Sequence, residues 1–207
     1  MLITDLLRQN AQQYPGESAL VSVDTKNLIP DQPDSYEACR RTLTWKQFDA
    51  LANRIANYLL HMGIRKGSKV GIMMMNRIEY LPLFFGILRA GAVSTQINFR
   101  YRSSELVQAA LLTDIEVLFY DSSSQAAIAE AQPALPQLRA CISLDETACE
   151  GSHRWQEVLN ASASDPGIAL DRSDDAAIYF SSGTTGAPKA VVHSHGTVVG
   201  ACILEQS

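Results

Sequence analysis

The chain has 207 residues and a mass of 22.6 kDa, which is long enough to bury the core of one full-sized domain. Apolar residues make up 46% of it and charged residues 19%, a balance typical of a folded globular protein rather than a disordered one. The net charge of −5 at pH 7 argues against a surface that follows a nucleic-acid backbone, so we expect no nucleic-acid partner.

No segment has the features of a membrane span or a secretion signal. The longest apolar run, residues 80–88 (YLPLFFGIL), is far shorter than the roughly 20 residues that span a bilayer, and it contains a proline. Asp5 interrupts the apolar start that a signal peptide needs. The four cysteines show no C-x-x-C pair or zinc-finger spacing, which indicates buried free thiols. We therefore expect a cytoplasmic protein without a transmembrane segment.

Residues that interrupt helices and strands indicate where the N-terminal elements end. Residues 4–14 predict a helix with Thr4 as its N-cap and Pro15 as its stop. Residues 19–23 predict a short strand, and the polar residues 24–41 predict an exposed loop.

The clearest predicted helix begins after Thr44, which forms a T-x-x-Q capping box with Gln47. It ends at Gly63. Its apolar residues recur at spacings of three and four: Phe48, Leu51, Ala52, Ile55, Leu59 and Met62.

From residue 69 onward, strands and helices alternate. Strands are expected over residues 69–75, 92–97, 117–121, 140–144, 176–180 and 190–194, and helices over residues 104–112, 125–131, 155–159 and 196–205, with a further helix capped by Asn76 and Glu79 and closed by Gly91. This alternation predicts crossover connections, so the fold class is α/β with a mostly parallel sheet.

We expect one α/β domain over residues 1–207, made of three parts. Residues 1–159 form the crossover region, and residues 160–175 are a polar connector. Residues 176–207 form a strand, a loop, a second strand and the start of a helix.

The strongest chemical signal is YFSSGTTGAPKAVVHSH, residues 179–195, where small residues lie between two β-prone apolar runs. Clustered glycines let successive backbone N–H groups turn toward one point, and neighbouring hydroxyls add donors. Lys189 supplies a positive charge, and Pro188 restricts the backbone beside it. The stretch therefore predicts a phosphate-binding loop.

Other loop motifs fit less well. A Walker motif fails because two residues separate Gly186 from Lys189, and a strand follows instead of a helix. The dinucleotide-binding motif G-x-G-x-x-G does not follow the first strand. Neither Ser182 nor Ser194 lies in the G-x-S-x-G motif of a serine-hydrolase nucleophile. A flexible Gly/Ser linker is disfavoured because apolar strands flank the stretch on both sides.

A metal site is a further alternative. His193 and His195 could share one face of a strand and bind a metal, but no third ligand is evident nearby. We therefore assign no metal-binding residues.

The stretch resembles the phosphate-loop signature of the adenylate-forming (AMP-binding) superfamily, which includes acyl-CoA synthetases, luciferases and adenylation domains. The matching residues are Ser182, Gly183, Thr184, Thr185, Gly186, Pro188, Lys189, Ser194 and His195. Residues 43–101 resemble the N-terminal region of the same enzymes, and INFR at residues 97–100 is closer to fatty-acyl-CoA synthetases. Ala190 and Gln96 depart from a usual glycine and a frequent proline.

The resemblance implies an incomplete, N-terminal part of the large domain of an AMP-forming acyl-CoA synthetase. Such an enzyme joins ATP, with Mg²⁺, to a carboxylic acid such as a fatty acid, and then transfers the acyl group to coenzyme A. The implied ATP-binding residues are Ser181, Ser182, Gly183, Thr184, Thr185, Gly186 and Lys189, of which Thr185 and Lys189 would be catalytic.

The family's adenine-binding, ribose-binding and C-terminal catalytic motifs have no counterpart in the 207 residues. We therefore expect that the chain is inactive alone and that the remainder of the enzyme is its partner. The alternative is a non-catalytic phosphate- or nucleotide-binding module, or an interaction module, derived from such an enzyme.

Overall fold

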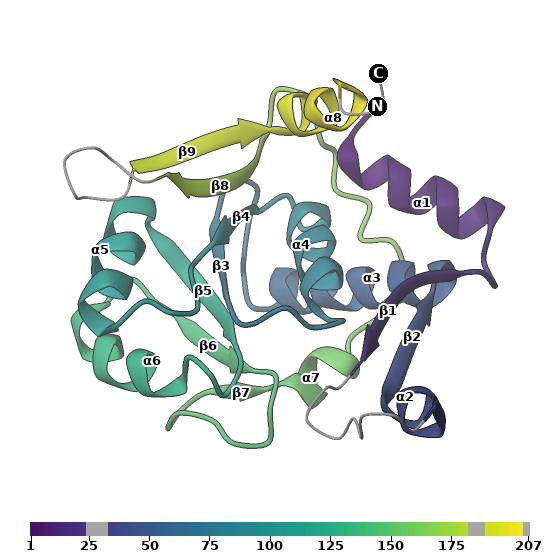
Figure 1. Ribbon diagram of the computed structural model, residues 1–207. Coiled ribbons are helices and arrows are strands. Elements are labelled where there is room, and N and C mark those ends of the chain that lie inside the picture. The colour runs from purple at the N-terminus through teal and green to yellow at the C-terminus, as the bar shows by residue number, and fades with distance from the viewer. Residues whose placement is uncertain (24–32, 182–188, 205–207) are drawn as a thin grey trace.

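The computed structural model describes residues 1–23, 33–181 and 189–204, and Figure 1 labels the helices and strands. The helices are α1 (Ile3–Gln13), α2 (Pro33–Cys39), α3 (Trp45–His61), α4 (Tyr80–Arg89), α5 (Ser103–Thr113), α6 (Gln125–Ala131), α7 (Trp155–Leu159) and α8 (His195–Leu204), with a short 3₁₀ helix η1 (Gln132–Ala134). The strands are β1 (Ser18–Val23), β2 (Arg40–Thr44), β3 (Lys69–Met73), β4 (Val93–Gln96), β5 (Ile115–Tyr120), β6 (Ala140–Ser143), β7 (His153–Arg154), β8 (Asp175–Ser181) and β9 (Lys189–Ser194).

A central seven-stranded sheet organises the fold, in the order β7-β6-β5-β3-β4-β8-β9. Each neighbouring pair is parallel except β8 and β9, which are antiparallel. The prediction of an α/β fold with a mostly parallel sheet is therefore confirmed. β1 and β2 form a separate antiparallel pair.

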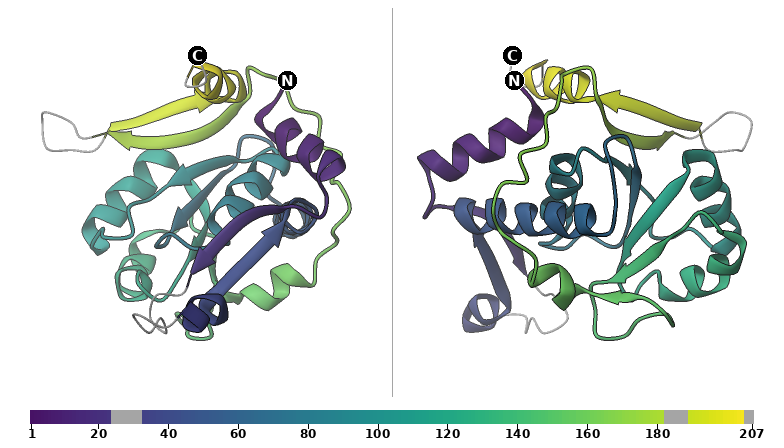
Figure 2. Two further views of the ribbon diagram at one scale, coloured as in Figure 1. Left: turned by 45° about the vertical axis from the view of Figure 1, so that its right-hand side comes forward. Right: turned by 180° about the vertical axis from the view of Figure 1, so that it is seen from behind.

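Helices cover both faces of the central sheet. Figure 1 and Figure 2 show α3 and α4 on one face and α5 and α6 on the other. Ile55 of α3 and Ile87 of α4 pack in one apolar core with Phe119 of β5, whereas Leu106 of α5 and Ile128 of α6 belong to a second core. Because the sheet is covered on both faces, β3 and β5 are mostly apolar, whereas β4 (VSTQ) also buries Ser94 and Thr95.

The order of the connections changes direction within the sheet. From β3 the chain passes through α4 to β4, and then through α5 to β5 on the other side of β3. Ligands of open α/β sheets bind outside the carboxyl ends of the strands at such a change of direction. Because β8 is parallel to β4, the carboxyl end of β8 points toward this same edge.

Residues 160–174 contain no helix or strand and run along α3. Asn57 donates from Nδ2 to the carbonyl oxygens of Ser162 (2.9 Å) and Ser164 (2.8 Å). Arg54 Nη1 donates to the carbonyl oxygens of Leu159 (2.7 Å) and Ala161 (2.5 Å), where α7 ends and this segment begins. Hydrogen bonds from side chains of α3 thus fix the backbone of the segment that connects α7 to β8.

The expected exposed loop over residues 24–41 is wrong in its second half. Pro33–Cys39 form α2 and the residues after them form β2, whereas residues 24–32 lie outside the described part of the chain. β2 forms because β1 offers an antiparallel partner, with Val21 opposite Thr42. A polar sequence such as RRTLT carries little strand signal by itself, so the cross-strand pairing decides its conformation.

Two of the predicted N-caps have different outcomes. The capping box of α3 is confirmed, because Gln47 N donates to Thr44 Oγ1 (3.2 Å) and Thr44 N donates to Gln47 Oε1 (2.9 Å). Thr4 is not the cap of α1, because it lies buried inside the helix. The cap is Leu2, whose backbone N–H donates to the Asp5 carboxylate at 2.7 Å.

Candidate nucleotide-binding site

The structure places two of the predicted site residues at the ends of the last two strands. Ser181 is the last residue of β8, Lys189 is the first of β9, and their Cα atoms are partners across the antiparallel pair. Both residues are exposed. Strand pairing therefore brings the lysine and one serine of the predicted loop side by side.

The remaining predicted site residues lie outside the described part of the chain. They are Ser182, Gly183, Thr184, Thr185 and Gly186. Their contribution to phosphate binding stays a prediction from the sequence.

A cavity of ≈ 330 Å³ lies where β3, β4 and β8 end. Its lining residues are Met74, Asn76, Tyr80, Gln96, Ile97, Asn98, Phe99, Tyr101, Tyr179 and Phe180. Phe180 directly precedes Ser181, so the cavity adjoins the start of the predicted loop. Among the residues that the structure describes, the lining contains amides, phenols and apolar groups but no Lys, Arg, Asp or Glu, which suits an uncharged part of a ligand.

Hydrogen bonds order the polar wall of this cavity. The Tyr80 hydroxyl donates to Gln96 Oε1, and Gln96 Nε2 donates to Ser94 Oγ at 2.7 Å. Burial, and secondarily the nearby Tyr179, raises the pKa of Tyr80 above its usual value. Tyr80 therefore stays a neutral hydroxyl at physiological pH.

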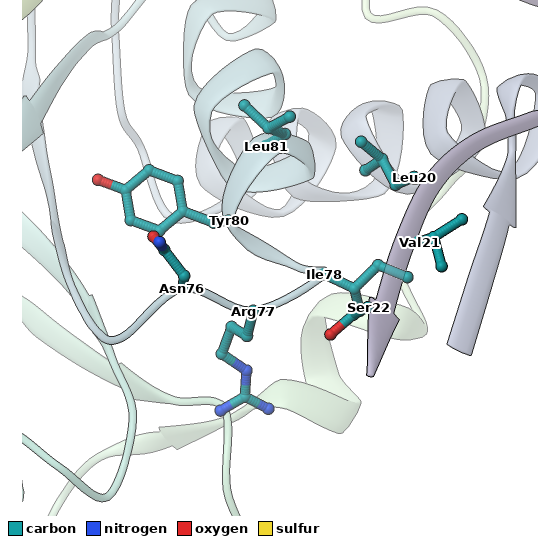
Figure 3. A pocket seen from close by; sticks show the side chains of 8 residues that line it. All are labelled: Leu20, Val21, Ser22, Asn76, Arg77, Ile78, Tyr80 and Leu81. Atoms are coloured by element: carbon teal, nitrogen blue, oxygen red, sulfur yellow. The ribbon is translucent and has the colours of Figure 1, made fainter. Parts of the chain in front are cut away.

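A second cavity, of ≈ 340 Å³, lies on the other side of Asn76 and Tyr80, which line both cavities. Figure 3 shows its lining, with aliphatic side chains from β1 and from the first turn of α4. The Arg77 guanidinium points away from Leu20 and Leu81 in this view.

Ion pairs account for the direction of Arg77. Its Nε lies 2.9 Å from Glu79 Oε2, and its Nη1 lies 2.9 Å from Asp145 Oδ1. Glu79 stands at the N-cap position of α4, but its side chain does not cap the helix, because Arg41 also holds it, at 2.7 Å. Burial acts to raise the pKa of Glu79, but the hydrogen bonds from Arg77 and Arg41 outweigh it and lower the pKa.

The two histidines of the sequence motif do not point to a metal. The His193 ring packs edge-on against the Tyr179 ring, with the ring centroids 5.5 Å apart. His195 begins α8 and is 1% exposed, and burial lowers its pKa. Across residues 1–23, 33–181 and 189–204, no group of three or more His, Cys, Asp or Glu side chains could hold a metal ion.

The four cysteines are free thiols, as expected, but they are not all buried. Cys141 and Cys149 are buried, Cys39 is half-buried and Cys202 is exposed.

Most of the cavity lining was not identified as functional from the sequence. Asn76 and Asn98 are polar residues that closely follow strands of a parallel sheet, and this position is a signal that could have indicated them. The sequence around Tyr80 and Tyr179 carries no such positional signal. The two side chains line one cavity only because the fold brings the first turn of α4 close to β8.

Comparison with known proteins shows which family the chain belongs to. A family model described as AMP-binding enzyme matches residues 7–206. The chain belongs to the AMP-binding enzyme family. The match includes every residue of the predicted phosphate-binding loop, so the resemblance seen in the sequence is confirmed.

This AMP-binding family member has relatives among fatty-acid–CoA ligases. It is 35% identical over 161 residues to the long-chain-fatty-acid–CoA ligase FadD13 of Mycobacterium tuberculosis H37Rv, covering 75% of the chain and 30% of that enzyme. It is 30% identical over 158 residues to a medium/long-chain-fatty-acid–CoA/3-oxocholest-4-en-26-oate–CoA ligase of Mycolicibacterium smegmatis, covering 74% of the chain and 29% of that enzyme. The chain thus spans about 30% of the length of these relatives.

Solved structures of family members share the fold. The anthranilate CoA ligase AuaEII in complex with anthranoyl-AMP matches with a TM-score of 0.81 and 26% identity, over 94% of this chain and 35% of that one. The N-terminal domain of FACL13 from Mycobacterium tuberculosis matches with a TM-score of 0.76 and 30% identity, over 94% of this chain and 44% of that one.

Within the described residues, we find no helix with the length and apolar character that crossing a membrane requires.

Proposed function

We propose that this chain is the phosphate-binding, N-terminal part of an AMP-forming acyl-CoA synthetase. The observation that carries the proposal is the position of Ser181 and Lys189, which flank the family's loop sequence at the carboxyl edge of the sheet, next to a cavity that Phe180 lines. Backbone amides and hydroxyls at this edge of an α/β sheet are suited to bind phosphate.

The reaction explains why such a loop is needed. A carboxylate oxygen of the acid attacks the α-phosphorus of ATP, the bond to the bridging oxygen breaks, and pyrophosphate leaves. Negative charge accumulates on the leaving group, and donors fixed in advance stabilise it. In the proposal, the hydroxyls of Ser182, Thr184 and Thr185 and the amides of Gly183 and Gly186 bind the β- and γ-phosphates.

Lys189 balances the charge of the phosphates, beside the Mg²⁺ that accompanies ATP. Its fixed place at the start of β9, opposite Ser181, supports this role because strand pairing limits where the side chain can reach. Thr185 and Lys189 are the proposed catalytic residues, since they would contact the groups whose charge changes during the reaction.

The substrates are proposed from the relatives. Several are named as ligases of long-chain or medium/long-chain fatty acids and CoA, so we assign a fatty acid as the carboxylic acid and coenzyme A as the acceptor of the second step. The cytoplasm, which supplies ATP and coenzyme A, is the proposed location. The remainder of the enzyme is the proposed partner, because the relatives are about three times as long as their matched part.

Titration calorimetry with Mg·ATP tests the phosphate-binding role in the 207-residue chain. We expect saturable binding that Lys189→Ala weakens by about 10- to 100-fold, because a hydrogen bond to a charged group contributes about 1.5–3 kcal/mol. Thr185→Ala should weaken it less, and the exposed Lys46→Ala on α3 should not change it. Equal affinity for the wild type and Lys189→Ala would contradict the proposal.

A kinetic assay separates the synthetase from a non-catalytic nucleotide-binding module. The assay follows the exchange of labelled pyrophosphate into ATP in the presence of a fatty acid. We expect exchange once the remainder of the enzyme is supplied, and none by the 207-residue chain alone. Nucleotide binding without exchange under both conditions would favour the module.

A further inference from the structure

The second cavity, between β1 and the start of α4, has two chemically different ends. In Figure 3, Leu20 and Leu81 lie at the top of the view, whereas the Ser22 hydroxyl and the Arg77 guanidinium lie toward the bottom. Its volume of ≈ 340 Å³ falls within the range of about 300–1,000 Å³ that is typical of small-molecule sites. Such sites combine mostly apolar walls with a few polar groups. This lining therefore fits a small molecule with one apolar end and one polar end.

Large aliphatic side chains on both walls of the second cavity are exposed. Val21 of β1 is 48% exposed and Leu81 of α4 is 43% exposed, whereas Ile78, which also lines the cavity, is buried. Removing apolar surface of this kind from water is favourable. A hydrocarbon segment is therefore the expected occupant of the apolar end.

Arg77 provides the polar end of the second cavity and is the only charged residue in its described lining. Its Nε and Nη1 lie 2.9 Å from carboxylate oxygens of Glu79 and Asp145, neither of which lines the cavity. Arg41 also pairs with Glu79, at 2.7 Å, so two arginines balance the charge of two carboxylates. Among the described residues, Nη2 of Arg77 has no acceptor, and its two N–H groups can donate to a ligand. A carboxylate is the group that a guanidinium binds best in this way.

We propose that the second cavity binds a small aliphatic carboxylate, with the carboxylate on Arg77 Nη2 and the chain against Leu20 and Leu81. This site goes beyond the proposed function. It lies on the other side of Asn76 and Tyr80 from the cavity at the ends of β3, β4 and β8, and its occupation requires no ATP. An aliphatic cation fits less well, because the described lining offers it no acidic partner and Arg77 would repel it.

Titration calorimetry of the 207-residue chain with sodium octanoate tests the charge preference of the site. Octylammonium chloride, which has the same chain length and the opposite charge, is the matched probe. We expect saturable octanoate binding that is at least about tenfold tighter than octylammonium binding, because only the carboxylate gains hydrogen bonds from a charged donor. The comparison uses the wild-type chain alone, so it does not depend on how a variant folds. No saturable octanoate binding, or equal affinity for the two probes, would overturn the proposal.

The variant Leu81→Glu tests the location of the bound acid. It places a second carboxylate at the apolar end of the cavity, so we expect the octanoate affinity to fall by at least about tenfold. Leu111→Glu is the matched control, since Leu111 on α5 is 52% exposed and lies outside the described lining; it should leave the affinity unchanged. Unchanged affinity in Leu81→Glu, or an equal loss in both variants, would overturn the proposed site. The titration with Mg·ATP tests the phosphate-binding role separately from these results.

Discussion

Glu79 shows how one side chain fixes the wall between the two cavities. It is 5% exposed and is held by Arg41 at 2.7 Å and Arg77 at 2.9 Å. Arg77 in turn reaches Asp145, so the segment that enters α4 is tied to the β6 end of the sheet. Asn76 and Tyr80 border this network, and their positions depend on it.

We predict that Glu79→Gln lowers the free energy of unfolding by about 2 kcal/mol at pH 7, because two guanidinium groups lose their ionised partner. Urea denaturation measures the change. Glu116→Gln is the control, since the side chains of Arg139 and Glu116 are 48% and 29% exposed and their pair should contribute less than about 1 kcal/mol.

The pH dependence of this difference provides a second check. The pKa of Glu79 is lowered from its ordinary 4.5, so its contribution to stability is complete above that value and is lost as the pH falls through the lower pKa of the folded state. The difference between the wild type and Glu79→Gln should therefore shrink below about pH 4.5. A difference that is constant with pH would contradict the ion-pair explanation.

At the scale of elements, α3 and α4 approach each other closely at Gly86. A Cβ atom added there would lie 2.6 Å from Ile55 Cβ and 2.8 Å from the Ala52 carbonyl oxygen. These contacts leave no room for a side chain, because both neighbours are part of a buried helix.

We predict that Gly86→Ala destabilises the fold by about 1–3 kcal/mol through overpacking. Gly200→Ala on α8 is the matched control, because a Cβ there meets nothing within 4 Å. That control should be neutral or stabilising by up to about 1 kcal/mol, as expected from helix propensity. Thermal unfolding of both variants measures the effects, and a Gly86→Ala variant as stable as the wild type would contradict the close packing.

Local sequence patterns predicted those elements whose own residues carry the signal. α3 has a capping box and regular apolar spacing, and β3 and β5 consist mainly of apolar residues. β2 and the two-residue β7 were missed because pairing with β1 and β6 creates them. The same limit applies to the candidate site: the loop sequence indicated Ser181 and Lys189, whereas Tyr80 and Gln96 depend on contacts between distant segments.

At the scale of the whole molecule, His195 links several parts of the fold. It begins α8, and the charged groups that influence its pKa come from three other segments: Asp174, Asp5 and Lys66. Burial lowers the pKa of His195 from its ordinary 6.5, although both aspartates act in the opposite direction.

We predict that stability falls as the pH drops below about 6.5, because the unfolded chain then binds a proton that the folded chain excludes. The loss is at most about 1.4 kcal/mol per pH unit for one group. His195→Gln should remove this dependence between pH 6.5 and 5.5, as measured by urea denaturation at each pH. An unchanged profile would show that His195 is not the group responsible.

The most direct test of the central claim, that the loop between β8 and β9 binds the triphosphate of ATP, is chemical labelling. An acyl-phosphate derivative of ATP transfers its acyl group to a lysine amine near the γ-phosphate and releases ATP, and mass spectrometry identifies the labelled residue. The account predicts that Lys189 is labelled and that excess Mg·ATP protects it. Labelling distributed equally over Lys46, Lys66, Lys69 and Lys189, without protection, would contradict the account.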